Sequence, residues 1–136
     1  AEVRRAIQGY RTRGLQAELQ SVRPALDAAG IELHAELPAL ALPAAAEGVL
    51  ALALREAVTN VARHSGAQHC WVGLKSDERT VSLEVRDDGK GGAGKEGSGL
   101  AGMRERARAL GGDVVRDASP GTRLLVSLPL AGGAAP

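Results

Sequence analysis

The stretch from Val81 to Met103 constrains this chain most, because an alternating strand there leads into a glycine-rich loop that ends at a helix. Val81, Leu83 and Val85 share one side of the strand, and Asp87 falls on the same apolar side. An unpaired ionised carboxylate is costly in a core. An inward Asp87 therefore indicates a purpose, such as accepting a hydrogen bond from a buried ligand.

Seven glycines follow Asp87 within the fourteen positions from Gly89 to Gly102. Glycine backbone lets N–H groups approach an anion closely, and a helix that begins after Gly97-Ser98-Gly99 offers its free N–H groups to phosphate. The order of strand, carboxylate, glycine loop and helix predicts a nucleotide pocket. The alternative interpretation is a flexible connection beside a surface aspartate, because short glycine patterns are weak signals alone.

Length and composition limit the classes of protein to which the chain can belong. At 136 residues it suits one domain with one core, which must be aliphatic because the chain has no Phe, one Trp and one Tyr. The formal net charge of +1 implies no field-driven binding of nucleic acid or of an anionic membrane. The lone Cys70 is expected to be a buried thiol. There is no apolar run of about 18 residues and no signal-peptide pattern.

Hydrophobic periodicity predicts the order of the elements. We expect a helix over 1–30, a strand over 31–37, a helix over 44–64, strands over 69–76 and 80–87, a helix over 100–110, and strands over 113–117 and 122–128. Gly9, Gly14 and Pro24 weaken the first helix, and Gly30 is expected to stop it. Because this helix begins without a cap, we expect the chain to be a segment of something longer.

Polar residues in this pattern divide into inward and outward groups. Thr122 shares its phase with Leu124 and Val126, so a second polar group enters the core side at a strand end, as Asp87 does. His34 falls in the polar phase of its strand and is expected to be solvated. The arginines of the 100–110 helix lie off its apolar stripe, and the expected solvent-exposed residues are Arg104, Arg106 and Arg108.

The 44–64 helix is expected to be central, and Glu56 and Asn60 lie one turn apart on the border of its apolar stripe. A carboxylate and an amide carbonyl in this arrangement form an oxygen site of the kind that Mg²⁺ prefers. Arg63 and His64 continue the same side and could meet phosphates. An ordinary polar flank, with capping or solvated roles for Arg63 and His64, is the alternative interpretation.

Together these pieces resemble the ATP-binding domain of sensor histidine kinases, in the superfamily shared with DNA gyrase, MutL and the ninety-kilodalton heat-shock chaperone. REAVTNVARHSGA (55–67) resembles the N box of that family, VRDDGKG (85–91) its G1 box, GSGLAGMRERARALGG (97–112) its G2 box, and SPGTRLLVSLP (119–129) its closing strand. The motifs occur in the family's order. GLxGMRER with NVxRHS is similar to the nitrate/nitrite-sensor-like subfamily.

The resemblance implies a role for each matching residue. Asp87 would accept from the adenine amino group, with Gly89 and Gly91 shaping that end of the pocket and Thr122 supporting the adenine. Asn60 would be a Mg²⁺ ligand, and Glu56 a residue of the metal shell that also helps to polarise the phosphoryl acceptor. The remaining implied contacts with ATP are Arg63, His64, Gly97, Gly99 and Leu100.

Two segments depart from the family's pattern. The closing loop reads PGT where PGxGT is common, which bears on the placement of Thr122. The lid over 90–97 is short and lacks a phenylalanine motif, as in the subfamily.

The implied fold is the Bergerat ATP-binding fold, a two-layer α/β sandwich with a mixed, mostly antiparallel sheet and helices on one face. Residues 1–22 would be the end of an upstream dimerisation helix or a linker, 23–130 the ATP-binding domain and 131–136 a flexible tail. The implied ligands are ATP and Mg²⁺.

The implied partners are the upstream phosphoacceptor domain and, indirectly, a response regulator, with no nucleic acid and a homodimer in the full-length kinase alone. The domain would be the cytoplasmic part of a membrane-bound sensor. An anti-sigma-factor serine kinase and an ATP-driven clamp such as gyrase or MutL are the competing classes.

Overall fold

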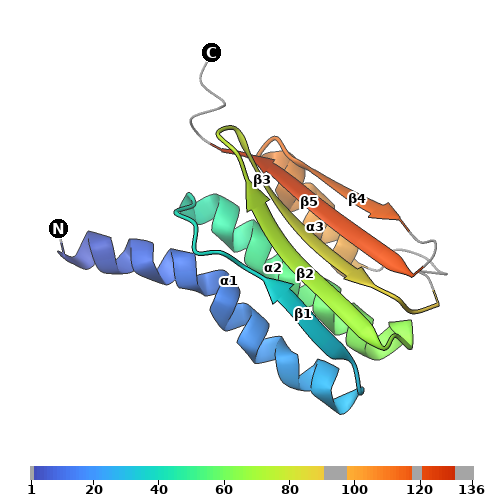
Figure 1. Ribbon diagram of the computed structural model, residues 1–136. Helices are drawn as coiled ribbons and strands as arrows, with labels where there is room; N and C mark the ends of the chain where they lie inside the picture. The colour runs from blue at the N-terminus through green and yellow to red at the C-terminus, as the bar shows by residue number, and fades with distance from the viewer. Residues whose placement is uncertain (1, 91–97, 118–120, 131–136) are drawn as a thin grey trace.

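The computed structural model describes residues 2–90, 98–117 and 121–130, with the backbone alone for 2–13 and for 98. Figure 1 shows the arrangement of its elements. In chain order they are α1 (Glu2–Ala28), β1 (Glu32–Glu36), α2 (Ala44–Asn60), the π-helical turn η1 (Val61–Ser65), β2 (His69–Ser76), β3 (Thr80–Asp87), α3 (Ser98–Ala109), β4 (Asp113–Asp117) and β5 (Thr122–Pro129).

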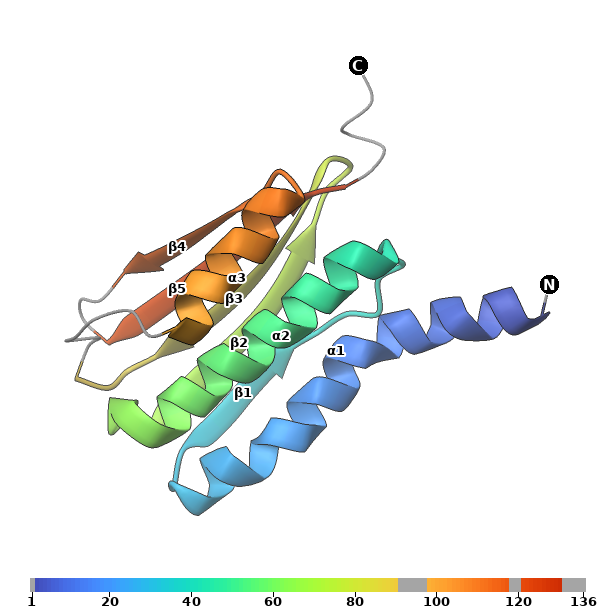
Figure 2. The ribbon, with the colours of Figure 1, turned by 180° about the vertical axis from the view of Figure 1, so that it is seen from behind.

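The strands form one sheet in the order β1-β2-β3-β5-β4. β1 pairs with β2 in parallel, and the other neighbouring strands are antiparallel. The helices cover one face of the sheet (Figure 2), and the opposite face, seen in Figure 1, is not covered by any described helix. The prediction of a two-layer α/β sandwich with a mixed, mostly antiparallel sheet is confirmed.

The core lies between the helices and the sheet and is aliphatic, as expected. α2 runs between α1 and α3 (Figure 2), and its stripe of Leu50, Leu54 and Val58 is fully buried. Each such side chain contributes about 1.5–3 kcal/mol through the apolar area that it removes from water. Alternate residues of β2, β3 and β5 face the same core, among them Cys70, Leu83 and Val126. This packing holds α2 in a fixed position over the sheet.

Glycines end two helices by the same hydrogen-bonding pattern. Gly30 has φ 73°, its N–H donates to the Asp27 carbonyl, and the Ile31 N–H donates to Leu26. Gly111 has φ 82°, with the corresponding bonds from Gly111 to Arg108 and from Gly112 to Ala107. This is a Schellman motif, which satisfies the last carbonyls of the helix and turns the chain sharply into the next strand. The predicted stop at Gly30 is confirmed, and the second motif ends α3 close to the expected end of the 100–110 helix.

α1 continues through Pro24 as one helix, although proline inside a helix removes a backbone hydrogen bond. The leucine and valine side chains on both sides of residue 22 enter the core, and the buried set is Leu15, Leu19, Val22 and Leu26. The sequence-based division at residues 22 and 23 therefore falls inside a continuous helix.

One expectation about an individual residue is wrong. Arg104 was expected to be solvated, but it is half-buried and its guanidinium donates to the Val114 carbonyl, which links α3 to β4. Arg106 and Arg108 are exposed, as predicted.

Candidate nucleotide-binding site

Asp87, at the end of β3, has a buried side chain that is 4% exposed, as the alternation of the strand predicted. Its Oδ1 accepts a hydrogen bond of 2.8 Å from the Gly89 N–H. Burial raises the pKa of Asp87, the Gly89 N–H opposes this rise, and the neighbouring charge of Asp88 adds to it. Asp87 is thus a carboxyl group whose ionised form is costly in the absence of a ligand.

Thr122 lies beside Asp87 across the β3–β5 ladder and is half-buried. Gly121, with φ 66°, precedes it, and a Cβ at this position would come within 3.0 Å of the Asp87 carbonyl oxygen. A larger residue at 121 would therefore push the two strand ends apart. The prediction that Asp87 and Thr122 lie on the same inward side is confirmed.

Gly89 packs directly on the end of the central helical segment. A Cβ at Gly89 would come within 3.0 Å of the Ser65 carbonyl oxygen, which also accepts from the Lys90 N–H at 3.1 Å. The Ser65 hydroxyl donates to the Val61 carbonyl and accepts from the Ala67 N–H, so it closes the π-helical turn. The loop after β3 thus lies against η1, and glycine is required at 89 by this close approach.

Glu56 and Asn60 lie one turn apart on α2, the first half-buried and the second exposed. A Cβ at Gly99 would come within 3.0 Å of both carboxylate oxygens of Glu56. The first turn of α3 therefore lies against Glu56, where its free N–H groups favour a carboxylate. Leu100 is buried behind it. The described residues thus bring α2 and α3 together at the end of the sheet where Asp87 lies (Figure 1).

The remaining predicted site residues are less confined. Arg63 and His64 are exposed on η1, which ends at Gly66 with φ 63°. Gly91 and Gly97, and the proposed lid over 90–97 apart from Lys90, lie outside the described residues.

Sequence reasoning missed the π-helical turn and the contact between Gly99 and Glu56. The expected helix over 44–64 continues beyond Asn60 as η1, whose wider turn places Ser65 inward. A helical wheel at 100° per residue does not anticipate this change of phase, because a π turn holds more residues. The sequence carries no signal for this turn, because the burial of Ser65 is known from the structure alone.

The residues at this site suit a nucleotide with Mg²⁺. A buried carboxylate that accepts hydrogen bonds matches the amino edge of a base, and the oxygens of Glu56 and Asn60 are of the type that Mg²⁺ takes alongside water and phosphate. Close glycine backbone and the start of α3 provide N–H groups for anions. This arrangement permits a nucleotide to bind with its base at one end of the site and its phosphates, together with Mg²⁺, at the other.

Comparison with known proteins identifies the class. Residues 46–132 match the family model described as histidine kinase-, DNA gyrase B- and HSP90-like ATPase, so the chain belongs to that family. Family membership implies that the domain binds ATP, and the Bergerat fold expected from the resemblance is confirmed.

Named relatives are sensor kinases. The chain is 34% identical over 134 residues to the sensor histidine kinase DesK of Bacillus subtilis, covering 94% of this chain and 36% of the relative. It is 42% identical over 79 residues to the histidine-protein kinase/phosphatase UhpB of Salmonella typhimurium, covering 55% of this chain and 16% of that protein. The prediction of a histidine kinase ATP-binding domain is confirmed. The chain spans about a third of DesK, and the nitrate/nitrite-sensor-like subfamily stays a prediction.

Solved structures share the fold. A histidine kinase domain of the blue-light activated kinase EL346 from Erythrobacter litoralis superposes with a TM-score of 0.73 at 16% identity, covering 85% of this chain and 60% of that one. The Acinetobacter baumannii histidine kinase AdeS gives a TM-score of 0.73 at 17% identity, covering 87% and 64%. No helix in the part of the chain that the structure describes has the length and apolar character to span a bilayer.

Proposed function

We propose that this chain is the catalytic domain that donates the γ-phosphoryl group of ATP to a histidine on a separate dimerisation and phosphoacceptor domain. The observation that carries the proposal is the buried Asp87 at a strand end, paired with Thr122 and followed by a loop that lies against η1, the continuation of the helix that bears Glu56 and Asn60. The whole protein would be a membrane-bound sensor with this domain in the cytoplasm, acting through a response regulator. Residues 1–22 would lead from the upstream domain into 23–130.

In this proposal each side chain positions or neutralises, because phosphoryl transfer depends on alignment and charge. Asp87 accepts from the adenine amino group, Thr122 supports the ring, and Gly89 and Gly91 keep that end of the pocket open. Leu100 supplies an apolar contact behind the start of α3.

The triphosphate end would use α2, η1 and α3. Asn60 and Glu56 would hold Mg²⁺, which supplies charge neutralisation to the phosphates when bound. Glu56 also orients the incoming acceptor, and Arg63 and His64 meet phosphate oxygens. Gly97 and Gly99 let the backbone approach those oxygens closely.

Calorimetric titration with ADP and an ATP analogue tests the assignment of Asp87. Asp87→Asn keeps the shape and the acceptor for Gly89 but offers a donor to the adenine amino group. We expect a loss of at least about 1.5–3 kcal/mol for both nucleotides. Unchanged ADP affinity in a folded variant would remove Asp87 from the site.

The same titration with and without Mg²⁺ tests whether Asn60 on α2 holds the metal ion. Asn60→Ala is expected to abolish the Mg²⁺-dependent part of triphosphate affinity and to leave adenosine binding largely intact, because the proposed role of the exposed Asn60 is to hold the metal and not the base. Thr59→Ala, one residue earlier and off that face, is the matched control. Retention of the full metal enhancement in Asn60→Ala would make Asn60 a polar flank only.

A further inference from the structure

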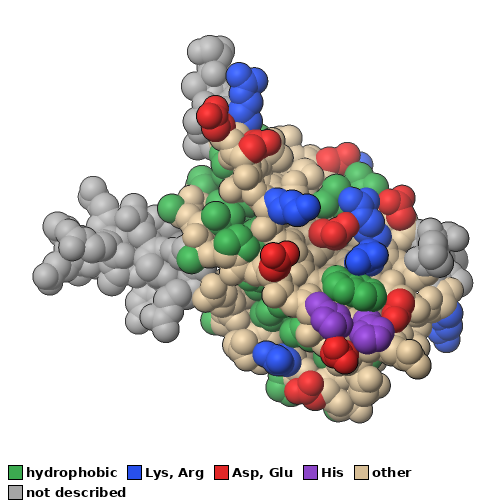
Figure 3. Space-filling model, viewed as in Figure 1, with side chains coloured by type: hydrophobic (Ala, Val, Ile, Leu, Met, Phe, Trp, Pro, Cys, Tyr) green, Lys and Arg blue, Asp and Glu red, His purple; other side chains and the backbone are tan. Residues whose placement is uncertain are grey.

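The face of the sheet opposite the helices carries a cluster formed by Glu32, His34 and His69. Figure 3 shows histidine side chains together on this face, with acidic side chains beside them. Glu32 and His34 are alternate residues of β1, so they point to the same side, and Glu32 lies beside His69 in the parallel β1–β2 register. One ligand-type atom from each residue lies within 4.8 Å of the others.

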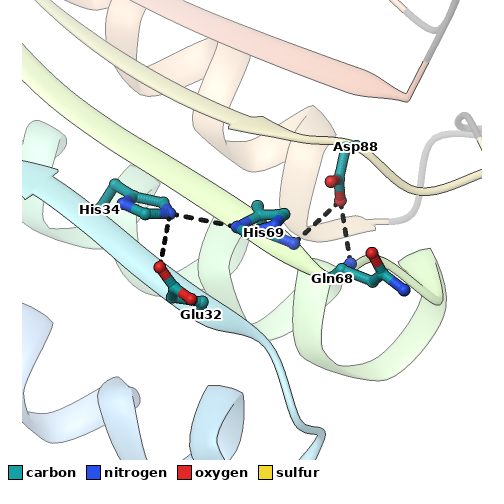
Figure 4. A network of polar contacts seen from close by, with 5 residues as sticks. All are labelled: Glu32, His34, Gln68, His69 and Asp88. Atoms are coloured by element: carbon teal, nitrogen blue, oxygen red, sulfur yellow. Dashed lines mark hydrogen bonds and ion pairs between the residues drawn. The ribbon is translucent and has the colours of Figure 1, made fainter.

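The distances within the cluster fit a shared cation. His34 Nε2 is 3.1 Å from His69 Nδ1 and 3.2 Å from Glu32 Oε2 (Figure 4). Two atoms that each lie about 2.0–2.1 Å from one tetrahedral ion are about 3.3–3.4 Å apart. Two of the three pairs of atoms are therefore close to this separation, and the third pair lies within 4.8 Å.

The protonation states of the two histidines are also compatible with a bound cation. His34 Nε2 carries at most one proton and faces both the Glu32 carboxylate and His69 Nδ1, whose role as donor or acceptor depends on the tautomer of His69. With the ring protons on His34 Nδ1 and His69 Nε2, both facing nitrogens present lone pairs. In this tautomer a divalent ion takes a lone pair from each of the three facing atoms.

The rings are held in place before any ion arrives. Trp71 of β2 stacks on both histidines, with ring centroids 5.6 Å apart in each case. Arg86 of the neighbouring strand β3 places its guanidinium 4.4 Å from the centroid of the Trp71 ring. The start of β2 is fixed because the Gln68 and His69 N–H groups both donate to Asp88 Oδ1 at 2.9 Å (Figure 4). Such support lowers the ordering cost of binding.

We propose that Glu32, His34 and His69 form a binding site for a divalent transition-metal ion of the Zn²⁺ type. Two imidazoles and one carboxylate are a ligand set that suits Zn²⁺ and leaves a fourth position open to water. Cys70 takes no part, because it faces the core and burial raises the pKa of its thiol to about 12. The site is separate from the nucleotide site and does not rest on the proposed function.

The test uses the whole chain without nucleotide, treated with EDTA and titrated calorimetrically with ZnCl₂ in excess Mg²⁺. We expect one ion per chain, and His34→Asn and His69→Asn should each lower Zn²⁺ affinity at least about tenfold. Glu32→Gln should lower it by less, because it keeps an oxygen but loses the charge. His64→Asn removes the third histidine of the chain, which lies on η1 outside the cluster, and should leave Zn²⁺ binding unchanged.

Co²⁺ gives a second readout that does not depend on calorimetry. Trp71 is the single tryptophan, so its fluorescence reports on this cluster, and bound Co²⁺ should quench it in the wild type and in His64→Asn. Circular dichroism checks that each variant is folded. Zn²⁺ affinity and quenching that are the same in His34→Asn and His69→Asn as in the wild type would overturn the proposal. One ion per two chains would also overturn it, because the site would then lie between molecules.

Discussion

Asp87 is a carboxyl group whose ionisation opposes folding, because burial raises its pKa above the ordinary value of 3.8. Between the ordinary pKa of the unfolded chain and the raised pKa of the folded chain, the folded chain binds more protons. The contribution of Asp87 to stability therefore falls as pH rises from the first value through the second. Asp87→Asn keeps an acceptor for Gly89 without the charge. We expect it to raise the free energy of unfolding at neutral pH by about 0.5–2 kcal/mol, measured by urea denaturation without nucleotide.

Asp77 is the matched control with the opposite sign. Its Oδ1 accepts from the Arg79 and Thr80 N–H groups in the β2–β3 turn, and these bonds lower its pKa. Its contribution is present above the ordinary pKa and is lost as pH falls through the lowered one. Asp77→Asn should therefore reduce stability at neutral pH, and a stabilising Asp77→Asn or a destabilising Asp87→Asn would contradict this account.

Cys70 lies directly beside Asp87 in the β2–β3 ladder and is fully buried. Burial, and then the charges of Asp87 and Asp88, raise the pKa of its thiol to about 12. Because the thiolate is the reactive form, we expect iodoacetamide at about pH 8 to leave the folded protein unmodified and to modify it fully in urea. Rapid modification of the folded protein, followed by mass spectrometry, would show that β2 opens readily.

At the scale of elements, the two ends of α3 respond differently to an added methyl group. At Gly112 a Cβ would come within 3.0 Å of the Ser127 carbonyl oxygen and of Leu128, whereas at Gly99 it meets the far end of the Glu56 side chain. Gly112→Ala should cost about 1–3 kcal/mol of stability, because backbone has to move. Gly99→Ala should cost little in thermal denaturation but should weaken Mg²⁺-dependent ATP binding. Equal thermal stability of the two variants would contradict this.

The elements that the sequence pattern predicted best are those buried on one side only. β2 and β3 occur where strict alternation placed them, and the Asp77 turn follows from its side chain capping its own loop. The same alternation predicted the inward Asp87 correctly. The pattern predicted the exposure of Arg104 wrongly, because tertiary packing overrides it there. Arg104 reaches the Val114 carbonyl only once β4 lies beside α3.

The candidate sites depended on sequence to different degrees. The nucleotide site follows from motifs that lie on the border of buried elements. The cluster of His34 with Glu32 and His69 could not be predicted from a motif. Residues 37–68 separate β1 from β2, and it is the parallel pairing of these strands that brings the three residues together. His34 was predicted to be solvated, and it is exposed, but its contacts come from a strand far along the chain.

For the whole molecule, we expect this chain to bind ATP without labelling itself on histidine. The chain has three histidines, of which His34 and His69 lie on the sheet face opposite the helices and His64 lies on η1. In-line transfer requires the acceptor within a few ångströms of the γ-phosphate. Radiolabelled ATP should leave this chain unlabelled and should give acid-labile label on an added phosphoacceptor domain. Acid-labile label on this chain alone would contradict the division of roles.

The parallel pairing of β1 with β2 has a kinetic consequence. Every other strand pair in the sheet closes an antiparallel ladder, whereas β1 reaches β2 only after α2 has crossed over between them. Closing so long a loop carries a larger entropy cost than closing the short Asp77 turn. We therefore expect the β2–β3 hairpin to form early in refolding and β1 to dock late. Amide protection in β1 should accordingly appear after that in β2 and β3 when hydrogen exchange is followed during refolding.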